Sequence, residues 1–250
     1  MFPNNNLHFI NLPAGSGKTT RIKEQVCERL IKEPDSHILV ITYTNRAVKE
    51  LEKQHFDSRV EISTIHSFIS KQIGPFFCVK NIVNEYFKCF ENEIDALLKD
   101  KKRIERIERF QKENNFEAFL TIDNIRQLTE RVKYGKRQYS DYLHAELSHD
   151  DLLTFYVFLL DKYPMFKYRV GEKYQLIIVD ECQDTDPRVL KRLASIAQDF
   201  SIECYVYGDL MQQIFNKDEN QLRGALNCFN PDKPESVKKS SICASNCQNA

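Results

Sequence analysis

Ala14-Gly15-Ser16-Gly17-Lys18-Thr19-Thr20 lies between the apolar segment Leu7–Ile10 and a run of residues with helical spacing. Backbone N–H groups in such a loop, together with a helix N-terminus, form an anion site. Gly15 and Gly17 let the backbone close around phosphate oxygens. Lys18 brings a positive charge to the β- and γ-phosphates, and Thr19 offers a hydroxyl to Mg²⁺. The stretch therefore predicts a phosphate-binding loop for a nucleotide.

The flanking residues favour this interpretation over a chance Gly/Ser turn. Ile22, Val26 and Leu30 recur at helical spacing after the loop, so the strand–loop–helix context that such a loop requires is present. One position departs from the usual GxxxxGK pattern, because Leu12 stands where the first glycine is expected.

Composition indicates an ordinary globular protein. The chain has 250 residues, of which 42% are hydrophobic and 29% charged, enough for one large domain or a domain with an insertion. Formal charge is 36 − 36 = 0, so a nucleic-acid partner would need a local basic face. The eight cysteines form no CxxC pair, and no signal peptide is visible, so we expect reduced thiols in a cytoplasmic protein. The longest apolar stretch, Leu152 to Leu160, is too short to span a membrane and predicts a buried helix.

Short β-branched runs alternate with helical stretches along the chain, which is typical of an α/β fold with a parallel sheet covered by helices. The predicted strands are Leu7–Ile10, Ile38–Ile41, Val60–Ile62, Leu176–Val179 and Cys204–Tyr207. Residues 84–147 show helical spacing and no clear strand, for instance at Ile104, Ile107 and Phe110. We therefore expect a domain formed by residues 1–83 and 148–250, with residues 84–147 as an inserted helical subdomain.

The insertion carries two basic groups whose role the sequence leaves open. The first is Lys99, Lys101, Lys102, Arg103, Arg106 and Arg109, and the second is Arg131, Lys133, Lys136 and Arg137, interleaved with Tyr134 and Tyr139. They form either a DNA-contacting face or a solvated, salt-bridged helix face, since Glu105, Glu108 and Glu130 lie among them.

Two adjacent carboxylates end the predicted strand Leu176–Val179. Side chains alternate along a strand, so Asp180 and Glu181 are expected to point in different directions. Mg²⁺ binds one or two carboxylates together with phosphate oxygens and water. We therefore predict that Asp180 is the metal-side residue and Glu181 the catalytic base for the attacking water.

Six segments of the chain resemble the motifs of one enzyme family. Asp180-Glu181-Cys182-Gln183-Asp184-Thr185-Asp186 resembles the DEFQDT motif of the UvrD/Rep-type superfamily 1 DNA helicases. Further segments resemble the family's motifs in the family's order: Ala14–Thr19 (AGSGKT), Thr42–Leu51 (TFTNKAAxEM), Ser63–Phe68 (GTFHSF), Asp150–Leu153 (FDDLL) and Tyr207–Phe215 (VGDxxQSIY).

The resemblance implies the first RecA-like P-loop NTPase domain of such an enzyme, with ATP and Mg²⁺ as cofactors. It implies catalytic roles for Lys18, Glu181 and Gln212, nucleotide contacts from Ala14, Gly15, Ser16, Gly17, Lys18, Thr19 and Thr20, metal contacts from Thr19 and Asp180, and a single-stranded DNA path along Tyr43, Asn45, Thr64 and His66. Gln212 would sense the γ-phosphate and couple it to domain motion. For Tyr43 a packing role is the alternative, for His66 a structural one, and for Gln212 a surface turn.

The resemblance also shows what this sequence lacks. Family members carry a Gln-containing adenine-reading segment before the loop and a second RecA-like domain with arginines that clamp the γ-phosphate. The thirteen residues before Ala14 show no such Gln-containing pattern, so no adenine-reading segment is expected. The second domain is not expected either, since Ser241-Ile242-Cys243 stands where the next motif would place its aromatic and its arginine. We expect an ATP-dependent helicase domain whose second RecA-like domain or subunit is supplied in trans. The alternative is a nucleotide-gated DNA-binding module without turnover of its own, acting as a subunit or regulator.

Overall fold

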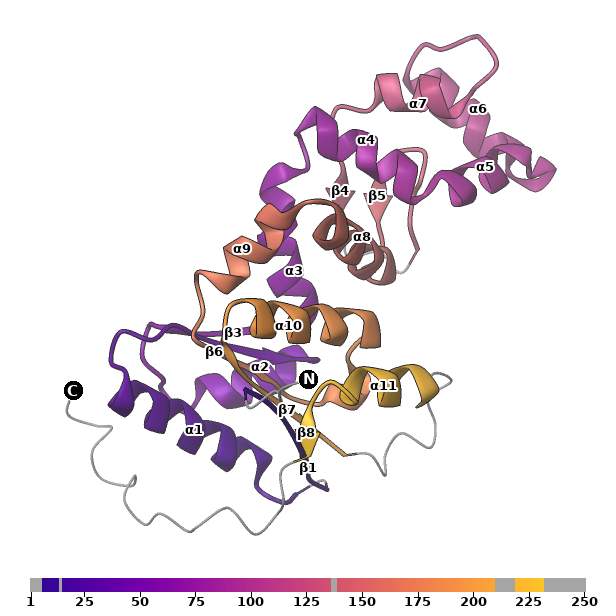
Figure 1. Cartoon of the computed structure of the whole chain (residues 1–250). Helices are drawn as coiled ribbons and strands as arrows, with labels where there is room; N and C mark the ends of the chain where they lie inside the picture. Colours follow the sequence, from indigo (N-terminus) through magenta and orange to yellow (C-terminus); the bar gives the residue numbers. More distant parts are fainter. Residues whose placement is uncertain (1–5, 14, 136–138, 210–218, 232–250) are drawn as a thin grey trace. The chain divides into compact units, whose positions relative to one another are not determined.

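The computed structural model describes residues 6–13, 15–135, 139–209 and 219–231 (Figure 1). The chain forms two compact units, the first made of residues 1–68 and 167–250 and the second of residues 69–166. The second unit thus extends on both sides of residues 84–147. Two helices, α3 (Ile65–Ile73) and α9 (Pro164–Gly171), contain residues of both units.

The first unit is built on a six-stranded parallel sheet with the order β3-β2-β6-β7-β1-β8. Its strands are β1 (Leu7–Asn11), β2 (Ile38–Thr42), β3 (Val60–Thr64), β6 (Leu176–Val179), β7 (Glu203–Gly208) and β8 (Asn230–Pro231). Every residue of β2 and β6 is buried, as expected for parallel strands covered on both faces. The α/β prediction and its five strands are confirmed, whereas β8 was not predicted.

Helices cover the sheet of the first unit. They are α1 (Lys18–Lys32), α2 (Asn45–Glu52), α10 (Pro187–Asp199) and α11 (Glu219–Leu226), with a short 3-10 turn η3 (Cys182–Asp184) after β6. Ile22 and Val26 of α1 pack with Leu51 of α2 into one core cluster, against sheet residues that include Val40 and Ile178. Figure 1 shows α10 on the face opposite α1. The sheet therefore holds the loop before α1 and the turn η3 on a rigid support.

The second unit is mainly helical. Its elements are η1 (Gly74–Phe76), α4 (Lys80–Cys89), α5 (Glu91–Lys99), η2 (Lys101–Arg103), α6 (Ile104–Glu113), α7 (Ile122–Leu128), β4 (Lys133–Tyr134), β5 (Glu146–Leu147) and α8 (His149–Lys162). The buried rings of Tyr86, Phe90 and Phe155 form its centre, with centroids 5.1 to 6.1 Å apart. The predicted buried helix is confirmed as part of α8, and the predicted helices as α5 and α6. The expectation of no strand was wrong, because β4 and β5 pair in parallel.

Some of the basic side chains in the second unit have acidic partners on their own elements. Lys99 pairs with Asp95, and Arg103 pairs with Asp100, at positions that are largely exposed. These pairs are what a solvated, salt-bridged helix face predicts. Lys136 and Arg137 lie outside the described residues. Among the described helices, none has the length and apolar character that a membrane span requires.

Candidate nucleotide-binding site

The loop between β1 and α1 has the backbone shape of an anion cradle. Gly15 and Gly17 adopt left-handed conformations, with φ of 75° and 85°. A Cβ added at either position would meet nothing within 4 Å, so the space beside the loop is open. Gly17 is the N-cap of α1 and has no side chain to accept the first-turn N–H groups, so these are directed toward a ligand.

Leu12 explains why a glycine is dispensable at the start of the loop. Its N–H donates to the Gly208 carbonyl over 2.8 Å and extends the ladder between β1 and β7 by one residue. Its side chain packs against the core cluster of the first unit. The loop then turns at Pro13, whose carbonyl accepts from both the N–H and the hydroxyl of Ser16. The departure from the usual pattern therefore lies in extended backbone, before the turn begins.

Asp180 lies directly after β6, and its side chain is buried with 7% relative exposure. Its N–H donates to the Ile41 carbonyl over 2.8 Å, which continues the pairing of β2 with β6. Burial and, next, the negative charge of Glu181 raise the pKa of Asp180 to about 6, while the Lys18 ammonium opposes them. A buried carboxylate with a raised pKa gains most from a cation, so the environment of Asp180 suits a metal ligand.

Glu181 leaves the strand in a left-handed conformation, with φ of 55° and ψ of 54°. The alternation of side chains along a strand, on which the sequence prediction rested, therefore does not set its direction. Its Oε2 accepts two hydrogen bonds, from Lys18 Nζ at 2.7 Å and from Gln183 Nε2 at 2.6 Å. A left-handed non-glycine residue costs about 1–2 kcal/mol, so the surrounding contacts hold this carboxylate in place.

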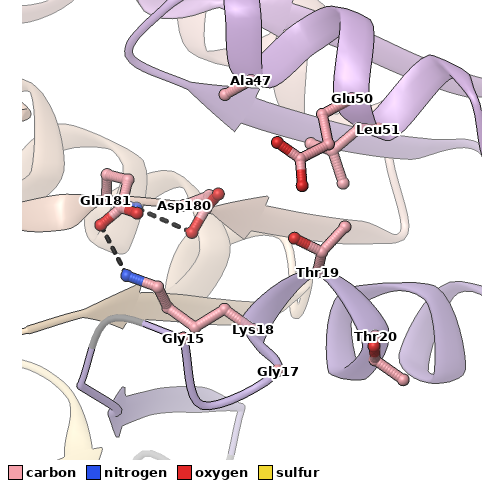
Figure 2. A pocket seen from close by; sticks show the side chains of 10 residues that line it. All are labelled: Gly15, Gly17, Lys18, Thr19, Thr20, Ala47, Glu50, Leu51, Asp180 and Glu181. Atoms are coloured by element: carbon pink, nitrogen blue, oxygen red, sulfur yellow. Dashed lines mark hydrogen bonds and ion pairs between the residues drawn. The ribbon is translucent and has the colours of Figure 1, made fainter.

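These elements enclose a cavity of about 460 Å³, shown in Figure 2. Gly15, Gly17, Lys18, Thr19, Thr20, Ala47, Glu50, Leu51, Asp180 and Glu181 line it. In Figure 2 the Thr19 hydroxyl faces the side of the cavity where Asp180 lies, whereas the Thr20 side chain points away from it. The cavity thus combines one ammonium group, one hydroxyl and three carboxylates around a glycine cradle.

The structure brings together most of the predicted nucleotide and metal residues. Gly15, Gly17, Lys18, Thr19, Thr20, Asp180 and Glu181 all line the cavity, while Ser16 is exposed beside it. Ala14 and Gln212 lie outside the described residues. Glu50 was not predicted as a site residue, yet α2 places it in the cavity and its charge contributes to the raised pKa of Asp180. Its only signal was the glutamate of the TFTNKAAxEM resemblance, to which no role was given.

The four residues predicted for a DNA path follow two neighbouring strands. Tyr43 comes after β2 and is 45% exposed, and its ring lies edge-on to His66 with centroids 6.4 Å apart. Asn45 is exposed at the start of α2. Thr64 ends β3, is 8% exposed, and accepts from the Ser67 N–H as α3 begins. Tyr43 and Asn45 are therefore open to a ligand, whereas the Thr64 hydroxyl already has a structural partner.

The fold and the cavity define a P-loop nucleotide-binding protein of the RecA-like class. The sequence profile of the AAA domain family matches residues 3–217, and the chain belongs to this family. Similar proteins include Gabija protein GajB of Bacillus cereus (strain HuB5-5), 24% identical over 83% of this chain, and ATP-dependent DNA helicase Rep of Buchnera aphidicola subsp. Acyrthosiphon pisum, 29% identical over 81%. ATP-dependent DNA helicase PcrA of Bacillus subtilis (strain 168) is 26% identical, also over 81%.

These relatives agree with the resemblance drawn from the motifs. The chain is a UvrD/Rep-type superfamily 1 helicase sequence that corresponds to the N-terminal half of such enzymes, and its ATP hydrolase and helicase family assignment is confirmed. It spans 41% of the length of the Gabija protein, 35% of Rep and 30% of PcrA.

Proposed function

We propose that this chain binds Mg·ATP and couples its hydrolysis to movement on single-stranded DNA, as the first of two RecA-like domains. One observation carries the proposal: a glycine cradle, an ammonium group, a hydroxyl and a buried carboxylate surround one cavity at the carboxyl edge of a parallel sheet. Ligands of open α/β sheets bind at this edge. The second RecA-like domain comes from another part of the protein or from another subunit.

The donor set of the cavity fits a magnesium-bound triphosphate. The left-handed glycines and the uncapped start of α1 provide N–H groups for phosphate oxygens. Thr19 and Asp180 would supply the hydroxyl and the carboxylate that hold Mg²⁺, a cation that takes oxygen ligands and keeps several waters. When bound, the metal neutralises charge on the phosphates. Glu50 also lines the cavity and would add a further carboxylate to this donor set.

Two side chains supply the remaining chemistry. Lys18 carries a fixed positive charge to the phosphate site, and Glu181 accepts a proton from the attacking water. The pair they form with each other ties up both groups, so each must exchange its partner before it acts. Gln183 donates to the same Glu181 oxygen as Lys18, so Glu181 keeps one neutral donor when Lys18 turns to a phosphate.

The cavity also suggests slow turnover for the chain by itself. No arginine is among the described residues that line the cavity. An arginine that reaches the γ-phosphate from a second domain contributes roughly 10³–10⁵ in rate in related P-loop enzymes. This observation favours the second candidate function for the isolated chain, a nucleotide-gated DNA-binding module that acts as a subunit or regulator.

Two titrations test the proposal. Calorimetry with Mg·ATP should show binding by the wild type, and fluorescence anisotropy with a labelled oligonucleotide should show single-strand binding that weakens with salt. A non-hydrolysable ATP analogue should change the DNA affinity, and DNA should change the nucleotide affinity by the same factor. Absence of nucleotide binding would reject the whole proposal, whereas nucleotide binding without any effect of DNA would reject its DNA part.

Turnover separates the two candidate functions. We expect very slow hydrolysis by the isolated chain, even with DNA, and stimulation when a second RecA-like domain is supplied. Gln212→Ala should reduce the reciprocal effect of DNA and nucleotide while it leaves nucleotide binding largely intact, since an amide can bond a phosphate and a neighbour at once. Turnover that stays negligible with the added domain would favour the nucleotide-gated module.

A further inference from the structure

Gln183 belongs to the motif Asp180–Asp186 and is hydrogen-bonded both to Glu181 in that motif and to Asp209 in the motif Tyr207–Phe215. It is buried, with 7% relative exposure, in the turn η3 after β6. Its Nε2 donates to Glu181 Oε2 over 2.6 Å, and its Oε1 accepts from the Asp209 N–H over 3.2 Å. Because the Asp209 N–H can only donate, the amide oxygen of Gln183 must face it. The amide nitrogen of Gln183 must then face the Glu181 carboxylate. The orientation of the side chain is thereby fixed by its partners.

The backbone around Gln183 leaves it little freedom. Gly208, the last residue of β7, approaches η3 so closely that an added Cβ would lie 2.3 Å from Cys182 Sγ and 3.1 Å from Gln183 Oε1. The Gln183 side chain therefore fills the space between η3 and the end of β7. A shift of Gly208 or Asp209 must move this side chain or break its hydrogen bond.

The two donors to Glu181 differ in how firmly they are held. Lys18 is a long, flexible cation that belongs to the phosphate loop, whereas Gln183 is short and tied at its other end to the backbone of β7. A donor with both ends fixed restricts the carboxylate more than a donor that must also serve a ligand. Gln183 is thus the constant partner of Glu181.

We infer that Gln183 is a positioning residue. It holds the Glu181 carboxylate where that group can accept a proton from the attacking water, and it links this position to the end of β7. Displacement of residues 208–209 then changes the position of the carboxylate directly, through one side chain. The inference rests on the proposed function for its effect on hydrolysis, while the link itself is a structural property that can be measured without turnover.

Two variants test the two hydrogen bonds of Gln183 separately. Gln183→Met keeps the approximate length of the side chain and loses both hydrogen bonds. Gln183→Glu keeps an acceptor for the Asp209 N–H and, while ionised, loses the donor to Glu181. Gln25→Met is the matched control. Gln25 lies on α1 and accepts a 2.7 Å hydrogen bond from the Tyr207 hydroxyl, and it does not line the cavity.

The structural readouts use nuclear magnetic resonance on the nucleotide-free chain. The Asp209 amide should exchange with solvent at least about tenfold faster in Gln183→Met, and at close to the wild-type rate in Gln183→Glu and Gln25→Met. The side-chain carboxyl ¹³C resonance of Glu181, assigned by its loss in Glu181→Gln, should shift in both Gln183 variants and not in the control. An unshifted resonance in Gln183→Met overturns the inference, whether or not the chain hydrolyses ATP.

The kinetic readout uses steady-state hydrolysis with a second RecA-like domain supplied. Loss of a hydrogen bond to a charged group corresponds to a roughly ten- to hundredfold effect, so kcat should fall by about that factor in both Gln183 variants. KM and the Mg·ADP affinity should stay within about threefold of the wild type. Wild-type kcat in Gln183→Met overturns the inference, because the donor to Glu181 would then be irrelevant. A wild-type protein without turnover, but with the shifted resonance, rejects the proposed function and keeps the link.

Discussion

Lys18 Nζ lies 2.7 Å from Glu181 Oε2, so the cation of the phosphate loop and the carboxylate after β6 form an ion pair in the nucleotide cavity. Lys18 begins the helix after β1 and Glu181 follows β6, and these two strands are not neighbours, because β7 lies between them in the sheet. The side chains are 10% and 32% exposed, so water screens the pair only partly. The pair therefore holds the cavity together across β7 while no phosphate competes for Lys18.

Replacing Lys18 tests the phosphate half of this pair. Lys18→Met removes the ammonium group but keeps an unbranched side chain, so Mg·ATP affinity should fall by roughly ten- to hundredfold, the usual cost of a lost charged hydrogen bond. Isothermal titration calorimetry measures the affinity. Lys32→Met, an exposed change in the last turn of the same helix, serves as control and should bind as the wild type does. Equal affinities for both variants would contradict the placement of phosphate at Lys18.

The pKa of Asp180 leads to a prediction about stability. Its folded-state value of about 6 lies above the ordinary 3.8, so the folded chain binds this proton more tightly than the unfolded chain does. The stabilisation that this proton gives the folded chain is complete below the ordinary pKa of 3.8 and is lost as the pH rises through about 6. Asp180→Asn removes the ionisation and keeps an oxygen acceptor for the Glu181 N–H. At pH 8 without Mg²⁺, the variant should therefore be more stable by up to about 3 kcal/mol.

Urea unfolding at two pH values checks this difference. The gain from Asp180→Asn should shrink as the pH falls and disappear below the ordinary pKa of 3.8, where this group is protonated in both the folded and the unfolded chain. Asp35→Asn, at an exposed position, controls for the loss of one negative charge. If the variant is less stable than the wild type at pH 8, ionisation of the buried Asp180 carboxylate does not destabilise the folded chain.

Tyr43 gives the prediction for DNA. Its ring is 45% exposed and rests edge-on against His66, so one face can stack on a base. Tyr43→Ala should cost about 1–3 kcal/mol of affinity for single-stranded DNA, measured by anisotropy at fixed salt. Tyr168→Ala is the matched control, since Tyr168 is 57% exposed on α9 and lies outside the motifs. If the two variants bind DNA equally well, Tyr43 has a packing role, the alternative that its sequence context left open.

The parts of this site that sequence predicted are those whose chemistry is carried by consecutive residues. The phosphate loop and the acidic pair each need several neighbouring side chains of fixed type, and both lie in the cavity. The five strands with apolar β-branched runs were also found, because burial on both faces leaves a strong pattern. The two-residue strand β8 (Asn230–Pro231) has no such pattern, and pairing with β1 alone defines it.

The parts that sequence missed depend on how separate segments meet. Glu50 reaches the cavity because α2 follows β2 at the correct angle, and a glutamate on a helix with so many charged neighbours gives no hint of this. The direction of Glu181 depends on a left-handed backbone that strand periodicity does not contain. The link from Gln183 to Asp209 joins residues that are 26 positions apart, so only the packing of β6 beside β7 reveals it.

The close approach of β7 to η3 gives the last prediction. Gly208→Ala would place a Cβ 2.3 Å from Cys182 Sγ, a distance that forces the two segments apart, so the variant should lose about 1–3 kcal/mol of stability. Gly224→Ala is the control, because the nearest atom to its added Cβ is 3.8 Å away and alanine is the better helix former in α11.

Removing the sulfur with Cys182→Ala should cost stability by itself, because it leaves a cavity beside Gly208. In the double variant, however, the new methyl group occupies the space that the sulfur leaves, so the combined loss should be smaller than the sum of the single losses. Gln183 Oε1, 3.1 Å from the same Cβ, keeps the recovery incomplete. Chemical unfolding of the four proteins in this cycle measures the coupling, and strictly additive losses would mean that β7 and η3 do not share this contact in solution.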